Sequence, residues 1–132
     1  MKLKIFTDGG ARGNPGPAAI GFIVVDEVTG KLVKKLGKQI GRATNNVAEY
    51  SAIIEAMKFL KNFFVEEANF FSDSQLVVNQ LNDRYKIKDH NLKNLIIEIK
   101  KLEQEVGGKI SYHLIPREQN QQADFLVNSS LA

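Results

Sequence analysis

Several things are missing from this 132-residue chain, and each absence removes a class of protein. It contains no cysteine, so disulfide bonds, thiolate metal sites and a cysteine nucleophile are all excluded. No apolar run approaches the roughly 20 residues that a membrane-spanning helix needs, and the first residues lack a secretory signal pattern. We therefore expect a cytoplasmic protein that makes no contact with a membrane.

The chain also has no internal repeat, low-complexity tract or linker, and its three prolines all fall in segments that we expect to be loops. Its length fits one domain, spanning 1–132, and suffices to bury a core without disulfides. A content of 43% hydrophobic and 25% charged residues is ordinary for a soluble globular protein. Composition therefore indicates one globular domain.

The charge balance is only mildly basic. Lysine and arginine number 18 against 15 acidic residues, which gives a net charge of +3. Basic residues gather in two stretches, Lys31–Arg42 and Arg84–Lys88. This is compatible with a polyanionic partner but equally with ordinary solvated faces, so charge alone decides nothing.

The first third of the chain has the patterns of β-strands. Lys2–Asp8 is β-prone and stops at Asp8-Gly9-Gly10, a turn signal. Ala11–Pro17 carries two glycines and two prolines, as expected of a loop. Ala19–Asp26 resembles a largely buried strand, and Lys31–Ile40 alternates as a third, antiparallel strand. We expect a three-stranded antiparallel unit here.

The pattern then changes to a helical period. Apolar residues recur at helical spacing from Val47 to Phe64, and Asn45 or Asn46 can cap the helix that they predict. The remaining segments predict a strand at 68–73, helices at 74–82 and 92–102, a strand at 109–115 and a helix at 119–131. The order βββαβααβα is typical of an α/β protein with a mixed sheet and packed helices.

Four acidic residues occupy informative places in this arrangement. Asp8 and Asp73 end the first and fourth predicted strands, Glu49 lies in the first turn of the long helix, and Asp124 lies in the terminal helix. Ligands of α/β sheets collect beyond the carboxyl ends of the strands. Each acid alone also has a structural explanation: a turn for Asp8, a capping box for Glu49, a helix cap for Asp73 and a solvated position for Asp124.

Four motifs contain these acids and cover nearly the whole chain. They are TDGGARGNPGPAAIG at 7–21, TNNVAEY at 44–50, SDSQLVVNQL at 72–81 and PREQNQQAD at 116–124. In this order and spacing the sequence strongly resembles type 1 ribonuclease H. The resemblance implies an RNase H-like fold with a five-stranded mixed sheet ordered 3-2-1-4-5 and helices on both faces. It also implies endonucleolytic hydrolysis of the RNA strand of RNA–DNA hybrids, leaving 5′-phosphate and 3′-hydroxyl ends.

The resemblance further implies two divalent metal ions, Mg²⁺ or Mn²⁺. Asp8 would bridge both ions, with Asp73 and Glu49 on one side and Asp124 on the other. Two such ions roughly 3.5–4 Å apart stabilise charge on the attacking and the leaving oxygen, and Mg²⁺ prefers hard oxygen ligands. Four clustered carboxylates without a metal repel one another, which makes such a cluster implausible as mere scaffold.

Recognition of RNA should depend on the 2′-hydroxyl group and on helix shape, because an A-like groove does not display base sequence usefully. The resemblance assigns the RNA strand to the backbone of Gly10, Ala11 and Arg12 and to Asn14, Asn46, Gln75 and Glu49. It assigns the DNA strand to Thr44 and Asn45, with a phosphate pocket near Asn14 and Arg42. Without the resemblance, the adjacent asparagines are equally well explained as helix caps.

The sequence departs from many bacterial members in two places. Only DRYKIKDHNLKN, at 83–94, occupies the region of their basic helical protrusion, so affinity for hybrid should be lower or more sensitive to salt. The loop before Asp124 reads PREQN and lacks their histidine. Arg117 is our candidate catalytic residue there, although pairing with Glu118 at the surface is an equally good explanation.

Other functions remain open on sequence alone. One is an inactive RNase H-like module that binds hybrid or double-stranded RNA, although all four acids are present. Others are junction resolvases, transposases and integrases, which lack the TNNxAEY and GNPGP pairing, and a domain within a reverse transcriptase, which we expect less because no linker is evident. The sequence implies no protein partner, and we expect a monomer that acts on RNA–DNA hybrid.

Overall fold

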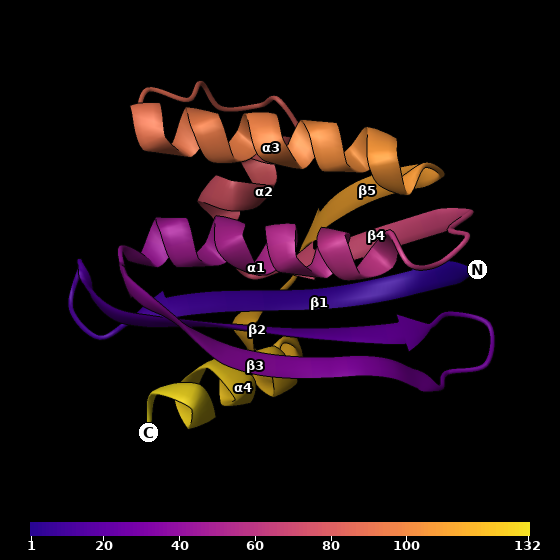
Figure 1. Ribbon diagram of the computed structural model, residues 1–132, viewed down its shortest axis with the longest axis horizontal. Coiled ribbons are helices and arrows are strands. Elements are labelled where there is room, and N and C mark those ends of the chain that lie inside the picture. Colours follow the sequence, from indigo (N-terminus) through magenta and orange to yellow (C-terminus); the bar gives the residue numbers. More distant parts are fainter.

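A five-stranded mixed sheet with helices on both faces makes up the computed structural model, which describes residues 1–132 (Figure 1). The strands are β1 Lys2–Ala11, β2 Gly16–Asp26, β3 Leu32–Ala43, β4 Glu67–Ser72 and β5 Lys109–Leu114. The helices are α1 Asn45–Leu60, α2 Gln75–Leu81, α3 His90–Val106 and α4 Gln121–Leu131, with a 3₁₀ turn, η1, at Arg117–Gln119. The predicted element order and the strand order 3-2-1-4-5 are both confirmed.

The direction of the strands changes at β1, in the middle of the sheet. β1 pairs antiparallel with β2, and β2 with β3, through short connections. β1 pairs parallel with β4, and β4 with β5, because α1 and then α2 with α3 carry the chain back across the sheet. A parallel pair therefore adjoins an antiparallel one at β1, and this places the carboxyl ends of β1 and β4 side by side.

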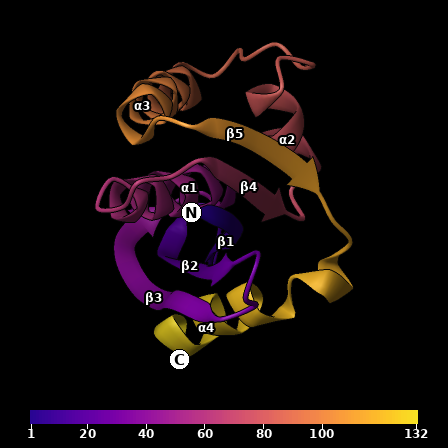
Figure 2. The same cartoon turned by 90° about the vertical axis from the view of Figure 1, so that its right-hand side faces the viewer.

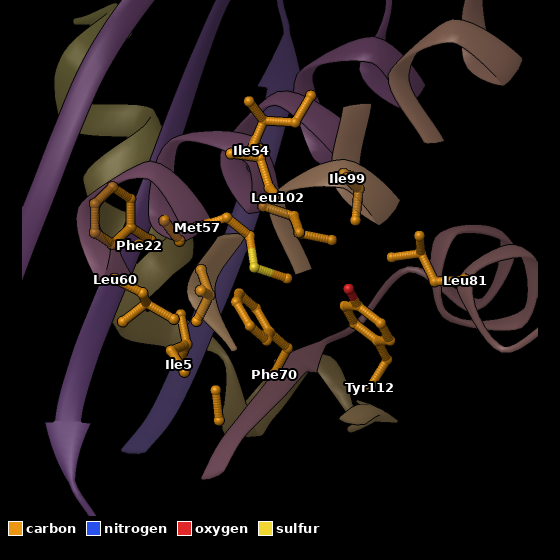
Figure 3. Close-up of a cluster of buried hydrophobic side chains, with 14 of the residues drawn as sticks. Ile5, Phe22, Ile54, Met57, Leu60, Phe70, Leu81, Ile99, Leu102 and Tyr112 are labelled. Atoms are coloured by element: carbon orange, nitrogen blue, oxygen red, sulfur yellow. The ribbon is translucent and has the colours of Figure 1, made fainter. Parts of the chain in front are cut away.

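The hydrophobic core lies between the sheet and α1, with α3 beyond it (Figure 3). Ile5 of β1 and Phe70 of β4 point from the sheet toward Met57 and Leu60 of α1, and all four are at most 1% exposed. Ile99 joins them from α3. Burying side chains of this size contributes about 1.5–3 kcal/mol each, so this layer fixes α1 on the sheet.

α4 lies on the opposite face, as Figure 2 shows. The sheet surface beneath α4 includes Gly21 of β2 and Gly37 of β3, which come within van der Waals distance of the helix backbone. A Cβ atom would lie 2.6 Å from the Ala123 carbonyl oxygen at Gly21 and 2.8 Å from the Leu126 carbonyl oxygen at Gly37. These glycines let α4 approach the sheet closely.

Local signals explain where the helices begin and end. The Asp89 side chain accepts a hydrogen bond from the Leu92 N–H at 3.1 Å and so caps α3. The same helix ends at Gly107, whose φ of 73° suits glycine, as the Gly107-Gly108 pair predicts. No helix in the chain combines the length and the apolar character that crossing a membrane requires.

The expectation that the first strand stops at Asp8 in a turn is wrong. Residues 9–11 continue the antiparallel pairing with β2. A pair of glycines is a turn signal only where nothing packs on them, and here Gly9 meets α1. A Cβ atom at Gly9 would lie 2.3 Å from the Ala48 carbonyl oxygen, so the glycine serves close packing within a strand.

Two details of the first helix are also corrected. Its cap is Thr44, whose Oγ1 accepts from the Val47 N–H at 3.2 Å, and not either of the asparagines that follow. The helix ends at Leu60, and Phe64 is 88% exposed although its spacing fits the apolar face. The chain leaves the helix before Phe64 because it must turn back toward β4.

Candidate active site

The site lies where β1 and β4 separate. Their parallel pairing runs from Lys2 opposite Glu67 to Phe6 opposite Phe71 and then stops. Asp8 follows two residues beyond the last pair, and Asp73 comes directly after Ser72, the last residue of β4. Two carboxylates that are 65 positions apart in sequence therefore meet at the carboxyl edge of the sheet, at the switch point of the topology.

Glu49 reaches the same place from α1. The close contact of Gly9 with the Ala48 backbone brings the first turns of the helix against β1. The Gly9 N–H donates a hydrogen bond of 2.7 Å to Glu49 Oε1. Glu49 is therefore held by the strand residue next to Asp8, and the capping-box role with Asn46 is not what it performs.

One carboxylate oxygen from each of Asp8, Glu49 and Asp73 lies within 4.8 Å of the others. Asp124, in the first turn of α4, lines the same pocket but does not join this tight group. Its Oδ2 accepts a hydrogen bond of 3.3 Å from the Asn128 side chain, one helical turn later. The Asp124 side chain and its charge nevertheless help to raise the pKa of Asp8, so the structure gathers all four predicted acids at one place.

Burial and mutual repulsion make this cluster unfavourable when all its members are ionised. Burial and then the charge of Asp73 raise the pKa of Asp8 to about 7. Burial and the charge of Asp8 raise the pKa of Glu49 well above its ordinary value. Burial also raises the pKa of Asp73, and this is opposed by the nearby polar side chain of Asn120 and by the positive charge of Arg117. Such a cluster attracts a compensating cation.

The acids line a pocket of about 410 Å³ on the surface. Ten of the residues singled out from the sequence line it: Asp8, Gly10, Ala11, Arg12, Asn45, Asn46, Glu49, Asp73, Arg117 and Asp124. Four others do not line it: Asn14, Arg42, Thr44 and Gln75. Sequence reasoning missed Gly9, Val127, Asn128 and Leu131. Of these, Asn128 could have been found, because it lies four residues after Asp124 on the same helix face.

Asn14 adjoins the pocket through hydrogen bonds. Its Oδ1 accepts from the Asn45 N–H at 3.0 Å, and Asn45 Oδ1 accepts from the Ala11 N–H at 2.8 Å. Both amide oxygens therefore accept from backbone N–H groups, and neither Nδ2 group donates a hydrogen bond within the protein. The two asparagines join the 11–17 loop to the start of α1 and keep donors available for a ligand.

The other predicted residues have varied surroundings. Arg42 is exposed on β3, opposite Pro17, and Gln75 is exposed at the start of α2. Arg117, in η1, lies close enough to Asp73 to lower its pKa, and it forms none of the structure's ion pairs. The surface pairing with Glu118 that the sequence left open is not formed.

Comparison with known proteins bears on this site. The profile of the family described as "Reverse transcriptase-like" matches residues 6–130. The chain is 38% identical to the bifunctional protein Rv2228c of Mycobacterium tuberculosis over 131 residues, which is 99% of this chain and 36% of that protein. It is 37% identical to the ribonuclease HI of Halobacterium salinarum over 130 residues, 98% of this chain and 64% of the relative. The chain thus spans between one third and two thirds of these relatives.

Among solved structures, LC11-RNase H1 in complex with an RNA/DNA hybrid superposes with a TM-score of 0.92. The two are 41% identical, and the match covers 98% of this chain and 96% of the other. Similarity on this scale extends over the whole sheet and all the elements that carry the acids.

Proposed function

This chain belongs to the type 1 ribonuclease H group of the reverse transcriptase-like family, and on that premise we propose that it is an endoribonuclease that hydrolyses the RNA strand of RNA–DNA hybrids. The observation that carries the proposal is the cluster of Asp8, Glu49 and Asp73, brought together from three separate elements with Asp124 in the same pocket. The relative solved in complex with an RNA/DNA hybrid supports the substrate class.

The donor set fits divalent metal ions. Three carboxylate oxygens lie within 4.8 Å of one another, and their pKa values are raised because they are buried together. Carboxylate oxygens are the ligands that Mg²⁺ and Mn²⁺ prefer. We propose that Asp8, Glu49, Asp73 and Asp124 hold two such ions. When bound, the ions would stabilise charge on the attacking and leaving oxygens of the phosphodiester, giving 5′-phosphate and 3′-hydroxyl ends.

The chain's own groups prepare the site for an anionic backbone. The Gly9 N–H fixes Glu49 Oε1, so this carboxylate keeps one orientation as substrate enters. Arg117 adds a positive charge beside Asp73, where it can attract the phosphate to be cut. We propose this electrostatic role for Arg117 in place of the missing histidine.

Recognition of hybrid follows from the donors along the pocket. Asn14 and Asn45 have their amide oxygens committed to backbone N–H groups, so their Nδ2 groups can donate to sugar or phosphate oxygens. The Ala11 and Arg12 N–H groups already donate within the protein, so the pocket side formed by 10–12 would serve a 2′-hydroxyl through carbonyl oxygens, which accept from it. Gln75 and Arg42 lie outside the pocket, where we propose that they contact the strands farther from the cut.

The test is cleavage of end-labelled substrates in Mg²⁺ and in Mn²⁺. We expect the RNA strand of a hybrid to be cut internally, and duplex DNA, single-stranded RNA and four-way junctions to stay intact. Intact hybrid with measurable binding would support the inactive binding module instead. Cleavage of DNA or of junctions would indicate the resolvase or transposase class.

A further inference from the structure

Asn120 occupies an unusual position for an asparagine at the start of a helix. It immediately precedes α4 and is only 1% exposed, yet its side chain caps no N–H group of that helix. Instead, its Nδ2 donates a hydrogen bond of 2.9 Å to the carbonyl oxygen of Thr7, which is 113 positions away on β1. Capping of the helix by the side chain therefore does not explain the asparagine at this position.

The accepting carbonyl belongs to the residue directly before Asp8. Pairing between β1 and β4 ends at Phe6, so Thr7 is the first residue of β1 beyond that ladder. The Asn120 side chain thus bonds β1 at the point where β4 no longer pairs with it. The same side chain also lies close enough to the Asp73 carboxylate to lower its pKa. One amide group therefore bonds the strand that carries Asp8 and lies beside the carboxylate of Asp73.

The backbone of Asn120 links the remaining parts of the site. Its carbonyl oxygen accepts from the Asp124 N–H at 3.1 Å, which forms the first turn of α4. Its own N–H donates to the Arg117 carbonyl oxygen at 3.0 Å. Asn120 accordingly stands between Arg117 and Asp124 and fixes the place where α4 begins relative to β1.

The side-chain oxygen of Asn120 indicates that the residue does more than fill space in the protein interior. Asn120 Oδ1 is the one buried side-chain nitrogen or oxygen atom in the structure that has no hydrogen-bond partner. Burying such an atom unpaired is unfavourable, and a leucine of nearly the same shape would avoid it. Turning the amide over would only place Oδ1 against the Thr7 carbonyl. The asparagine therefore supplies a donor at that point in spite of a stability penalty.

We propose that Asn120 is a positioning residue: its amide sets the spacing of Asp8, Asp73 and Asp124 and so tunes affinity for divalent cations and the rate of hydrolysis. This inference rests on the proposed function, because it assigns Asn120 a task within that same site. Groups that orient metal ligands typically change metal affinity or activity by about 10–100-fold when they are removed.

Two variants of the full chain test this, with a matched control. Asn120→Ala removes the amide, and Asn120→Leu removes it while keeping its approximate shape. Asn82→Ala is the control, because Asn82 Nδ2 also donates to a strand carbonyl, Tyr112 at 3.1 Å, but outside the pocket. Mn²⁺ affinity of the metal-free proteins is measured by titration calorimetry, together with kcat, KM and Tm.

We expect both Asn120 variants to lose about 10–100-fold in Mn²⁺ affinity and in kcat, with KM for hybrid nearly unchanged. Asn82→Ala should lower Tm alone. Wild-type Mn²⁺ affinity and kcat in a folded Asn120 variant would overturn the proposal, and so would equal losses in Asn82→Ala. If wild-type protein cuts no hybrid while the Asn120 variants still lose Mn²⁺ affinity, the proposed function fails and the positioning role stands.

A measurement on the wild type covers the case in which neither variant folds. The side-chain amide resonances of Asn120 and Asn82 are followed by NMR during Mg²⁺ titration of the metal-free protein. We expect the Asn120 resonances to shift and to saturate with the affinity found by calorimetry, while those of Asn82 stay in place. An Asn120 amide that does not respond to Mg²⁺ would contradict the proposal.

Discussion

Asp8 has the most constrained surroundings of the four acids. It is 8% exposed, Glu49 and Asp73 lie close by, and the charges of Asp73 and Asp124 both disfavour its ionised form. A side chain in this position is costly to the folded state unless a cation offsets the repulsion. The Asp8 carboxylate should therefore lower the stability of the metal-free protein and yet be required for cleavage, and these two effects can be measured separately.

The first prediction concerns Asp8→Asn. The change removes one charge and hardly any volume, so hybrid binding should be nearly unchanged, while cleavage should fall by more than the roughly 100-fold that loss of a group supporting a metal ligand can cause. Filter binding and a cleavage assay measure the two effects. Cleavage near the wild-type rate would refute a metal-ligand role for Asp8.

The second prediction concerns pH and the metal-free protein. An aspartate carboxyl ordinarily ionises near 3.8, whereas the pKa of folded Asp8 is about 7. Between these values the folded state binds more protons than the unfolded state, so the free energy of unfolding should decrease as pH rises from 4 to 7, and the raised pKa values of Glu49 and Asp73 add to this decrease. Thermal melts in chelator across this range measure it.

Two controls make the pH prediction specific. Asp8→Asn should weaken the dependence, because one of the three groups with a raised pKa is gone. Excess Mg²⁺ should stabilise the wild type most at high pH, where the carboxylates are ionised and bind the cation best. A stability that increases steadily from pH 4 to 7 in chelator would contradict the raised pKa.

At the scale of elements, α4 is the part that depends most on close backbone contact. It brings Asp124 to the pocket, yet only Ala123 and Val127 of this helix are buried. Its attachment to the sheet depends on Gly21 of β2 and Gly37 of β3, which leave room for the helix backbone. The position of Asp124 is therefore sensitive to any side chain added beneath the helix.

Gly37→Ala tests this dependence. The new Cβ would lie 2.8 Å from the Leu126 carbonyl oxygen, so α4 must shift. We expect a loss of about 1–3 kcal/mol in unfolding free energy, typical of overpacking, and reduced cleavage through displacement of Asp124. Gly30→Asn is the control, because Gly30 has φ of 74° with nothing near its Cβ position and asparagine tolerates this conformation. Equal stability of the two variants would argue against close docking of α4.

Sequence patterns predicted the order of the helices and strands correctly but misplaced some of their ends. Helical and strand periods gave the order of elements, because those periods reflect which face each segment buries. The end of β1 was predicted wrongly because Gly9 packs against α1 and does not form a turn. The neighbouring residues in the sequence give no sign of that contact. Phe64 was placed in α1 by spacing alone, although it is 88% exposed. Helix ends depend on where the chain must go next.

At the scale of the whole molecule, the site consists of segments that meet only in the fold. Motifs gave the four acids, but which of their oxygens lie within 4.8 Å of one another depends on tertiary contacts. Asn120 was passed over for the same reason, since its bond to Thr7 joins the two ends of the chain. Local patterns identify residue types, whereas distances between elements come only from packing.

The charge of the whole molecule leads to a prediction about salt. The segment between α2 and α3 is short, and Arg84, Lys86 and Lys88 are exposed on it. With a net charge of only +3, binding to hybrid should depend on few phosphate contacts. Replacing all three residues by Gln should weaken binding evenly across hybrid sequences and reduce the slope of log K against log salt by about two to three.

Fluorescence anisotropy with labelled hybrid in Ca²⁺, from low to moderate KCl, measures that slope without cleavage. Lys31, Lys34 and Lys35 replaced by Gln provide a control of equal charge loss near β3 and away from the α2–α3 segment. If both triple variants lose the same slope, net charge and not position governs affinity. A loss confined to the 84–88 variant would mean that this short segment takes over phosphate contacts from the longer protrusion of other members, because only charges at the contact surface release counterions on binding.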